Sequence, residues 1–478
     1  MKKVILSALL ACSIFGQLIF AAPTASPTAA PSASPAVSAS PSASPSASPS
    51  PSASPSASPK TDKPEETAEF PEPHAAAAIL IDRKSGDILY QKNKDEKMYP
   101  ASTTKIMTAV LALENGKLTD SVTATDEAVA PITFQHSNMG IKVGETFTLE
   151  QLLYGMLVYS ANDAANVIAV HIGGGLDAFA AMMNNKAQEL GLSGTHFKNA
   201  HGFHDDDHYT TAQDLATLTK YAMQNEKFCE IVKTGLYRIP ANDLYQQERV
   251  LSTTNHLISR YRNTKYFYKY AVGVKTGHTD EAGSCLVGAA TKGDMELISV
   301  ILKADEPQDG TLYAFADSAK MYDYIFTNYK YCKIAAQDEV VSDSAVYEAK
   351  NGIRVALSPK DNIDKLMPKD TDTEQIKAET TLAEKIKAPI AKGDVLGSVT
   401  YTYMGKELGK TELVAGNDVE RDKILAVIHI IINIIKNPLF ILGVIALIFL
   451  ILSSRSKRKK RRKKRRSQLK YSNQSNRY

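Results

Sequence analysis

A run of 29 residues near the C-terminus, Ile424 to Leu452, contains a single charged side chain. A helix needs about 20 apolar residues to cross a bilayer, so we assign residues 424–454 to a membrane anchor with its span near 434–453. Residues 455–466 hold 11 Lys or Arg, and basic residues mark the cytoplasmic side of a span. The sequence therefore predicts a single-pass membrane protein with a cytoplasmic tail, residues 455–478, and with its main body outside the cell membrane.

The net charge of the whole chain, +4, hides a strong asymmetry. Residues 455–478 hold 13 Lys or Arg and no acid. When these and Lys2, Lys3 and Lys436 are set aside, the stretch from Lys60 to Lys423 carries a net charge of −12. The basic charge belongs to the tail behind the membrane span, so it gives no reason to expect nucleic-acid binding.

Two N-terminal segments are predicted to lie outside any folded domain. Residues 1–22 have the pattern of a secretory signal peptide, with two lysines, an apolar run and a small-residue end at Ala21-Ala22. An uncleaved anchor and a lipoprotein site at Cys12 are the alternatives. We expect residues 23–74 to be an extended, disordered segment. From Pro23 to Pro59 the sequence is almost purely Pro, Ser, Thr and Ala, with Pro-Ser-Ala-Ser repeated, a composition with almost nothing to bury.

Residues 75–335 carry the pattern of one α+β domain. Strands are predicted at 76–81, 88–90, 271–274, 284–290 and 297–302. Helices are predicted at 102–113, after the capping box Thr148-Leu-Glu-Gln151, over 164–190, over 215–232 and near 312–325. Because strands stand at both ends of the unit with helices between them, we expect the terminal strands to share one sheet.

Residues 336–423 differ from the preceding unit. Short alternating runs such as Ile353–Leu357 and Val395–Tyr403 are separated by glycines, which predicts a small all-β domain. Of the cysteines outside the signal peptide, Cys229, Cys285 and Cys332 form an odd set. That number favours buried free thiols, with one disulfide as the alternative.

Ser102-Thr-Thr-Lys105 opens a predicted helix, where a spacing of three places hydroxyl and amine on one face. A lysine can accept the proton of a serine only if burial or a nearby cation lowers its pKa. A helix N-terminus also supplies donors for a developing oxyanion. The motif alone is weak evidence, because it recurs in the tail at Ser454–Lys457 and Ser467–Lys470.

Two further motifs are ambiguous in isolation. Ser160-Ala-Asn162 lies between predicted helices and is compatible with an ordinary helix cap. Lys-Thr-Gly, which can offer a cation and a hydroxyl to a carboxylate, occurs twice. The copy at 233–235 ends a helical run and resembles a basic last turn with a Gly cap. The copy at 275–277 follows a predicted strand at a sheet edge, where an extended peptide could pair with the backbone.

Ser-x-x-Lys, Ser-x-Asn and Lys-Thr-Gly in this order resemble the signature of penicillin-binding proteins and serine β-lactamases. Over about 75–420 the chain closely resembles the low-molecular-mass D-alanyl-D-alanine carboxypeptidases, peptidase family S11. The matching stretches are Ile81–Gly86, Pro100–Lys105, Ser160–Ala165, His201-Gly202, Thr211–Leu215 and Lys275–Thr279. The resemblance implies an α+β catalytic domain of the serine β-lactamase/penicillin-binding transpeptidase type, with an antiparallel sheet and helices. A small all-β domain and the membrane helix would follow it.

The resemblance also implies catalytic roles. Ser102 would be acylated, and Lys105 would accept its proton. Ser160 would relay a proton toward the leaving D-alanine. The expected partners are peptidoglycan stem peptides ending in D-Ala-D-Ala, with β-lactams as inhibitors; no metal, cofactor or nucleic acid is implied.

Substrate binding is implied for five further positions. Asn162 would orient the substrate amide, and Lys275 and Thr276 would hold the terminal carboxylate. Gly277 completes the Lys-Thr-Gly triplet and is also expected to bind substrate. The backbone N–H groups of Ser102 and His278 would form the oxyanion hole.

Three other functions compete with carboxypeptidase activity. A β-lactamase usually needs a Glu-x-x-Leu-Asn loop, which is absent between Ser160 and Lys275. Endopeptidase cleavage of cross-links is compatible with the same motifs. A non-catalytic wall-binding protein would be expected to lack a reactive residue, but Ser102, Lys105 and Lys275 are all present.

The loop 203–208, Phe-His-Asp-Asp-Asp-His, is unusually acidic and histidine-rich for the family that the chain resembles. It leaves the preference for substrate side chains open. A metal site built from His196, His201, His204 and His208 is an alternative. No spacing among them matches a known ligand pattern, so we favour a solvated loop.

Overall fold

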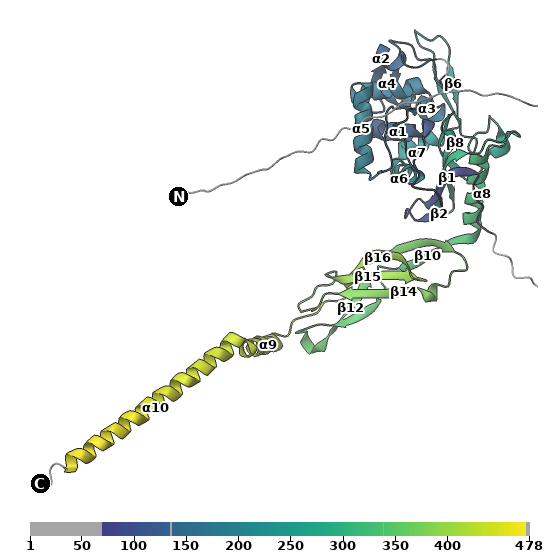
Figure 1. Cartoon of the computed structure of the whole chain (residues 1–478). Helices are drawn as coiled ribbons and strands as arrows, with labels where there is room; N and C mark the ends of the chain where they lie inside the picture. The colour runs from purple at the N-terminus through teal and green to yellow at the C-terminus, as the bar shows by residue number, and fades with distance from the viewer. Residues whose placement is uncertain (1–68, 134–135, 338, 475–478) are drawn as a thin grey trace, which may run out of the picture. The chain divides into compact units, whose positions relative to one another are not determined.

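The computed structural model describes residues 69–133, 136–337 and 339–474 (Figure 1). The predicted signal peptide and all but the last residues of the Pro/Ser/Ala-rich segment therefore lie outside the described residues. An α+β region, a β-rich region and two C-terminal helices follow one another along the described chain.

The α+β region is built on a five-stranded antiparallel sheet. Its order is β2 (Ile88–Lys92), β1 (Ala75–Asp82), β9 (Met295–Ala304), β8 (Gly283–Lys292) and β7 (Ala271–Thr279). The first strand of the region pairs with the last, with Ala78 opposite Ile301. The prediction that the terminal strands share one sheet is confirmed, and β7 forms one edge.

Each face of the sheet packs against a different set of helices because side chains alternate along a strand. Ala77, Ile79 and Ile81 of β1 belong to the larger core, which the helices between β2 and β7 complete. Ala78 and Leu80 face the other way, into a smaller core with α8 (Tyr313–Asn328).

The helices on the larger core are α1 (Lys105–Asn115), α3 (Leu149–Val158), α4 (Asn162–Gly173), α5 (Leu176–Glu189), α6 (Ala212–Ala222) and α7 (Glu226–Val232). The smaller elements are α2 (Asp126–Val129), β3 (Ser121–Thr123), β4 (Thr146–Thr148), β5 (Leu236–Ile239), β6 (Arg249–Ser252) and the 3-10 turns η1 (Ala101–Thr104) and η2 (Thr264–Tyr266). The capping box predicted at Thr148 is confirmed, with Gln151 as its second member.

Two predicted helices are wrong because each is broken. The run over 164–190 bends by 82° after α4, where Gly174 adopts a left-handed φ of 76° that ends the helix. The run over 215–232 is interrupted before α7, whose N-terminal amides are capped by the side chain of Asn225.

The β-rich region begins at β10 (Tyr329–Ala335), before the expected limit at residue 336. β10 pairs with β13 (Ile363–Pro368), and a five-stranded sheet has the order β11-β12-β16-β15-β14. Those strands are β11 (Ser342–Ala345), β12 (Arg354–Pro359), β16 (Lys406–Ala415), β15 (Val395–Tyr403) and β14 (Lys377–Leu382). The predicted all-β character is confirmed, with Val355, Leu413 and Val419 in its core.

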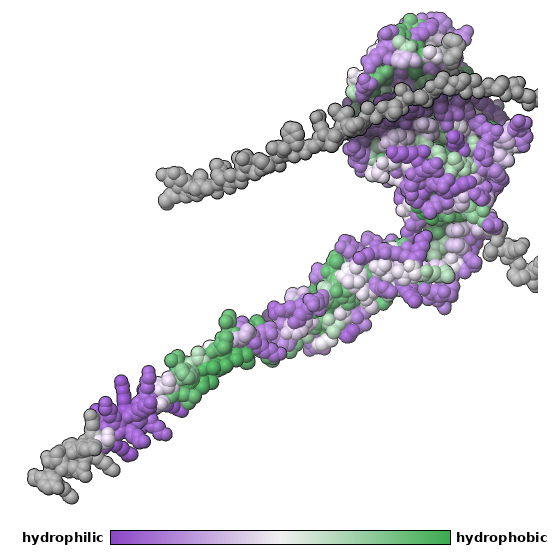
Figure 2. Space-filling view, viewed as in Figure 1, coloured by the Kyte–Doolittle hydropathy of each residue, from purple (hydrophilic) through white to green (hydrophobic). Residues whose placement is uncertain are grey.

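The chain then forms α9 (Lys423–Lys436) and α10 (Pro438–Gln474). The membrane span expected near 434–453 therefore includes the break between these two helices. The break occurs because Pro438 has no N–H to continue α9, while the side chain of Asn437 accepts a hydrogen bond from the N–H of Leu439 at the start of α10. Within the described residues, α10 is the one unbroken helix long and apolar enough to cross a membrane. Figure 2 shows its apolar half in green and the basic continuation in purple.

The three cysteines outside the predicted signal peptide are free thiols. Cys285 and Cys332 are buried and Cys229 is partly buried. The sequence left free thiols and one disulfide as alternatives, and the structure has the free thiols.

Candidate active site

The side chains of Ser102 and Lys105 meet at the start of α1. Ser102 lies in the turn η1, and Lys105 is the first residue of the α-helix, so the expected helix begins as a tighter turn. The Nζ atom of Lys105 lies 2.8 Å from Oγ of Ser102, 2.6 Å from Oδ1 of Asn162 and 2.7 Å from the carbonyl oxygen of His201. The amine is thus held against the hydroxyl by two fixed acceptors.

Burial prepares the Lys105 amine to accept a proton. Its side chain is fully buried, which lowers its pKa well below the usual value; the charge of Lys275 lowers it further and Asp163 opposes the shift. A neutral amine has the lone pair that a proton acceptor needs. The geometry and the electrostatics therefore favour the same chemistry.

Ser160 occupies the turn between α3 and α4 with a left-handed φ of 67°. It is not a helix cap: Ala161 precedes α4 directly, and no side chain caps this helix. The Ser160 hydroxyl instead accepts a hydrogen bond from Nζ of Lys275 at 3.0 Å. Asn162, the first residue of α4, reaches Lys105. The Ser-x-Asn motif thus hydrogen-bonds to both buried lysines, through Asn162 to Lys105 and through Ser160 to Lys275.

The second Lys-Thr-Gly triplet lies within the edge strand β7, which continues through Thr279 instead of ending at Val274. Lys275 is buried, and burial lowers its pKa to about 7. The hydroxyl of Thr276 lies 2.6 Å from that of Thr254. A Cβ on Gly277 would stand 3.0 Å from the backbone nitrogen of Ser102. A larger residue would therefore separate the strand from the nucleophile.

A cleft of about 320 Å³ joins these elements. Its lining residues are Ser102, Ser137, Ser160, Thr254, His256, Thr276, Gly277, His278, Ser284, Cys285, Leu312 and Phe315. Lys105, Asn162 and Lys275 lie buried behind it and bond to residues of its wall. His278 is exposed at the cleft, with Nε2 3.1 Å from Oε1 of Glu306. All eight residues singled out from the sequence therefore meet at one place.

Sequence reasoning missed several residues of this site. Thr254, Ser137 and His256 line the cleft but belong to no recognised motif, so the sequence carried no signal for them. Asp163 lies within the matching stretch Ser160–Ala165, but the sequence alone assigns it no role. Burial raises its pKa, although hydrogen bonds from backbone N–H groups, including those of Ile141 and Met139, oppose the shift.

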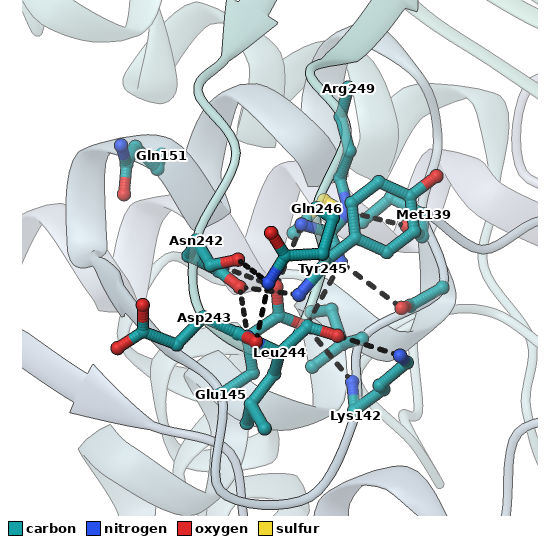
Figure 3. Close-up of polar contacts among 12 residues, drawn as sticks. Met139, Lys142, Glu145, Gln151, Asn242, Asp243, Leu244, Tyr245, Gln246 and Arg249 are labelled. Atoms are coloured by element: carbon teal, nitrogen blue, oxygen red, sulfur yellow. Dashed lines mark hydrogen bonds and ion pairs between the residues drawn. The ribbon is translucent and has the colours of Figure 1, made fainter.

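Arg249 and Glu145 form a buried ion pair (Figure 3). The pair braces the loop before β4, the same loop in which Ser137 lies along the chain. Arg249 contacts both oxygens of Glu145, at 2.8 and 2.9 Å, and also donates to the carbonyl of Met139 at 2.8 Å. Burial alone would raise the pKa of Glu145, but hydrogen bonds from Arg249 and Asn242 lower it overall. The ring of Tyr245 lies 3.8 Å from the guanidinium carbon. The pair stays charged and ties the loop to β6.

The braced loop is joined to the Ser-x-Asn turn. The Asp163 carboxylate accepts hydrogen bonds from the backbone N–H of Met139 at 3.1 Å and of Ile141 at 3.0 Å. The Asn162 N–H donates to the carbonyl of Ser137 at 2.8 Å. Movement of this loop would therefore displace the residues that hold Lys105.

The histidine-rich loop is only partly solvated, which corrects our interpretation of it. Asp206 and Asp207 are exposed, but His208 is buried, with Nε2 2.8 Å from Oγ1 of Thr104. Burial lowers the pKa of His208 to about 3, so the ring is neutral. Among the residues that the structure describes, no three His, Cys, Asp or Glu are grouped to hold a metal ion. His208 instead supports the turn beside the nucleophile.

A buried amine against a serine hydroxyl, faced by the edge strand of an antiparallel sheet, defines the class of active-site serine enzymes that includes the penicillin-binding proteins. A family model described as D-alanyl-D-alanine carboxypeptidase matches residues 64–306. A second, described as the C-terminal domain of penicillin-binding protein 5, matches residues 329–421. The chain belongs to the D-alanyl-D-alanine carboxypeptidase family, peptidase family S11, and is an enzyme of the serine-hydrolase type.

Individual relatives agree over most of the chain. Identity to the D-alanyl-D-alanine carboxypeptidase DacF of Bacillus subtilis is 33% over 352 residues, covering 73% of this chain and 86% of the relative. Identity to DacC of Escherichia coli is 31% over 375 residues, covering 74% and 87%. The crystal structure of penicillin binding protein 5 from Haemophilus influenzae has a TM-score of 0.61 at 28% identity, covering 74% of this chain and 100% of that chain.

Proposed function

We propose that this protein removes the terminal D-alanine from peptidoglycan pentapeptides through an acyl-enzyme on Ser102. The observation that carries the proposal is the 2.8 Å contact between the buried Lys105 amine and the Ser102 hydroxyl. Burial and the charge of Lys275 lower the pKa of Lys105 well below its usual value, which favours the neutral amine that can take the serine proton.

The acylation step follows from this arrangement. As the Ser102 proton moves to Lys105, Oγ attacks the carbonyl carbon of the penultimate D-alanine. The backbone N–H groups of Ser102 and His278 stabilise the oxyanion. When the C–N bond breaks, Ser160 passes its hydroxyl proton to the departing amine of D-alanine and takes back the proton held by Lys105. The proton removed from Ser102 is thus accounted for, and Lys105 is neutral again. Lys275 and Thr276 hold the carboxylate of that residue throughout. Water then hydrolyses the ester and restores the hydroxyl.

β-Lactams should acylate the same serine. Attack on the lactam carbonyl opens the ring, so the leaving nitrogen remains attached to the acyl group and cannot diffuse away. The bulky acyl group then hinders the approach of water. The expected result is a long-lived covalent penicilloyl adduct on Ser102.

We infer that α10 anchors the enzyme in the cell membrane. Its apolar half is followed by the basic run 455–466, and the positive-inside rule then puts the tail in the cytoplasm. The catalytic region would face the cell wall, where its substrate is found. A protein truncated at Arg421 should be soluble and should still hydrolyse a soluble pentapeptide; a folded but inactive product would contradict this division of roles.

Labelling with a fluorescent penicillin, followed by product analysis on a pentapeptide, tests the function. The wild-type protein should label stably and release D-alanine. Ser102→Ala should abolish labelling because it removes the nucleophile, and Lys105→Ala should do nearly the same because the two residues act as a unit. Fast release of the label would indicate a β-lactamase, and no labelling an inert binder. Acylation of Lys105→Ala near the wild-type rate would show that the proton acceptor lies elsewhere.

A further inference from the structure

The lining of the cleft includes two contrasting groups of side chains. The first group contributes hydroxyls and consists of Ser102, Ser137, Ser160, Thr254, Thr276 and Ser284. The second group is aromatic or apolar and consists of His256, Leu312 and Phe315. We call these last three residues the aromatic wall. They belong to no motif and have no role in the proposed chemistry.

The aromatic wall is assembled from separate chain segments and is firmly packed. The rings of His256 and Phe315 meet edge to face, with centroids 5.0 Å apart. The backbone N–H of Leu312 donates to the hydroxyl of Tyr266 at 2.8 Å. Phe315 is 6% exposed and Tyr266 8%. Because the wall is held by buried neighbours, it cannot easily move aside for a bulkier substrate.

The wall adjoins the hydroxyls assigned to the substrate carboxylate. Thr276 and Thr254 are within hydrogen-bond distance of each other, and His256 follows Thr254 by two residues. Burial lowers the pKa of His256, so its ring is neutral at pH 7. The two lysines behind the described lining of the cleft, Lys105 and Lys275, bond to Ser102 and Ser160 among the hydroxyls, and no hydrogen bond joins either lysine to the three residues of the aromatic wall. The wall therefore offers a continuing chain an apolar barrier and no charged partner.

We propose that His256, Leu312 and Phe315 close the cleft next to the site of the substrate carboxylate. They would favour peptides that end at the departing D-alanine over cross-linked peptides, in which the chain continues past the scissile bond. The inference rests on the proposed function, in which Thr276 holds that carboxylate. A cross-linked substrate carries a longer leaving group after the scissile bond, which would need the space of the wall. The enzyme should therefore act as a carboxypeptidase in preference to an endopeptidase.

The test compares kcat/KM on a soluble pentapeptide with kcat/KM on a soluble cross-linked muropeptide dimer. The wild-type protein should favour the pentapeptide. Phe315→Ala should shift the ratio about tenfold toward the dimer, since pocket steric effects of this size are usual. His256→Ala should shift it in the same direction, whereas His256→Phe, which preserves the ring, should not.

Phe326→Ala is the matched control. Phe326 is also a buried phenylalanine of α8 in the same core, but it does not line the cleft. Penicillin labelling counts the active sites in each preparation, so a loss of folded protein does not alter the ratio of the two kcat/KM values. If Phe315→Ala fails to fold, Phe315→Leu is used in its place. An equal shift in Phe326→Ala, or none in the Phe315 and His256→Ala variants, would overturn the inference.

The outcome for the wild-type protein separates this inference from the proposed function. If the protein labels stably and releases D-alanine but is equally active on the dimer, only the selective role of the aromatic wall is refuted. Absence of both labelling and release would refute the proposed function, and the wall with it.

Discussion

The two Lys-Thr-Gly triplets have the same sequence and opposite surroundings. Lys233 is exposed at the end of α7, and the hydroxyl of Thr234 donates back to the carbonyl of Glu230 within that helix. Lys275 is buried in an edge strand and donates to Ser160, while Thr276 contacts Thr254. One triplet completes local backbone structure, and the other connects three distant segments.

The difference shows what turns a triplet into a binding site. Burial lowers the pKa of Lys275 to about 7, and the same lysine lowers the pKa of Lys105. A solvated lysine such as Lys233 has no comparable partner in the cleft. The effect on chemistry comes from the dielectric environment and the neighbours, and the three residue types alone do not specify either.

Among the variants that test this contrast, Lys275→Ala should have the largest effect on activity. Loss of the cation should lower kcat/KM by about 10²–10³ on a D-Ala-D-Ala peptide, as for loss of one preorganised electrostatic contact. Acylation by penicillin should also slow, because Lys275 helps keep Lys105 neutral. Steady-state kinetics and labelling rates measure both effects. Similar damage from Lys233→Ala would show that we assigned the carboxylate to the wrong triplet.

The glycines give the next largest contrast. A Cβ at position 277 would lie 2.9 Å from the carbonyl oxygen of Pro100 and 3.0 Å from the nitrogen of Ser102, whereas at position 235 its nearest contact is 3.8 Å away. Gly277→Ala should displace Ser102 and reduce the rate of penicillin acylation by up to about 10²-fold. Gly235→Ala should label at nearly the wild-type rate. Unimpaired labelling of Gly277→Ala would mean that the strand and the nucleophile can separate without harm.

The third test uses pH. If Lys275 must be protonated to bind the carboxylate, kcat/KM should fall as pH rises through its pKa of about 7, because kcat/KM reports groups of the free enzyme. Lys275→Arg stays charged at all these pH values, so its activity, though lower, should not decline in this range. An identical alkaline decline in both proteins would assign the titration to another group.

The smallest expected effect is that of Lys233→Ala. The side chain is exposed, so its loss should change the free energy of unfolding by no more than about 0.5 kcal/mol. Activity on both the peptide and penicillin should remain at the wild-type level. Thermal melting and steady-state kinetics on the same preparation suffice, and a large loss of either quantity would contradict the surface assignment.

Much of this site could be predicted because its parts are encoded locally. Ser102 and Lys105 are one helical turn apart, and a strand pattern precedes Lys275, but each motif is weak or ambiguous alone. The order of the three motifs and the resemblance to a known family were needed to assign the site. Thr254 and Ser137 were missed because their positions depend on how distant segments pack. The break after α4 was missed although the sequence marks it with Gly173-Gly174-Gly175, because apolar residues at helical spacing resume at Leu176 beyond the glycines.

The left-handed conformation of Ser160 also bears on how the protein evolves. A non-glycine residue at a φ of 67° costs about 1–2 kcal/mol, and glycine would adopt this conformation without that cost. Ser160→Gly should therefore stabilise the fold while removing the hydroxyl that bonds to Lys275. Selection for thermal resistance and selection for turnover thus oppose each other at this position. A library screened for folding alone should lose serine here, and one screened for cell-wall trimming should keep it.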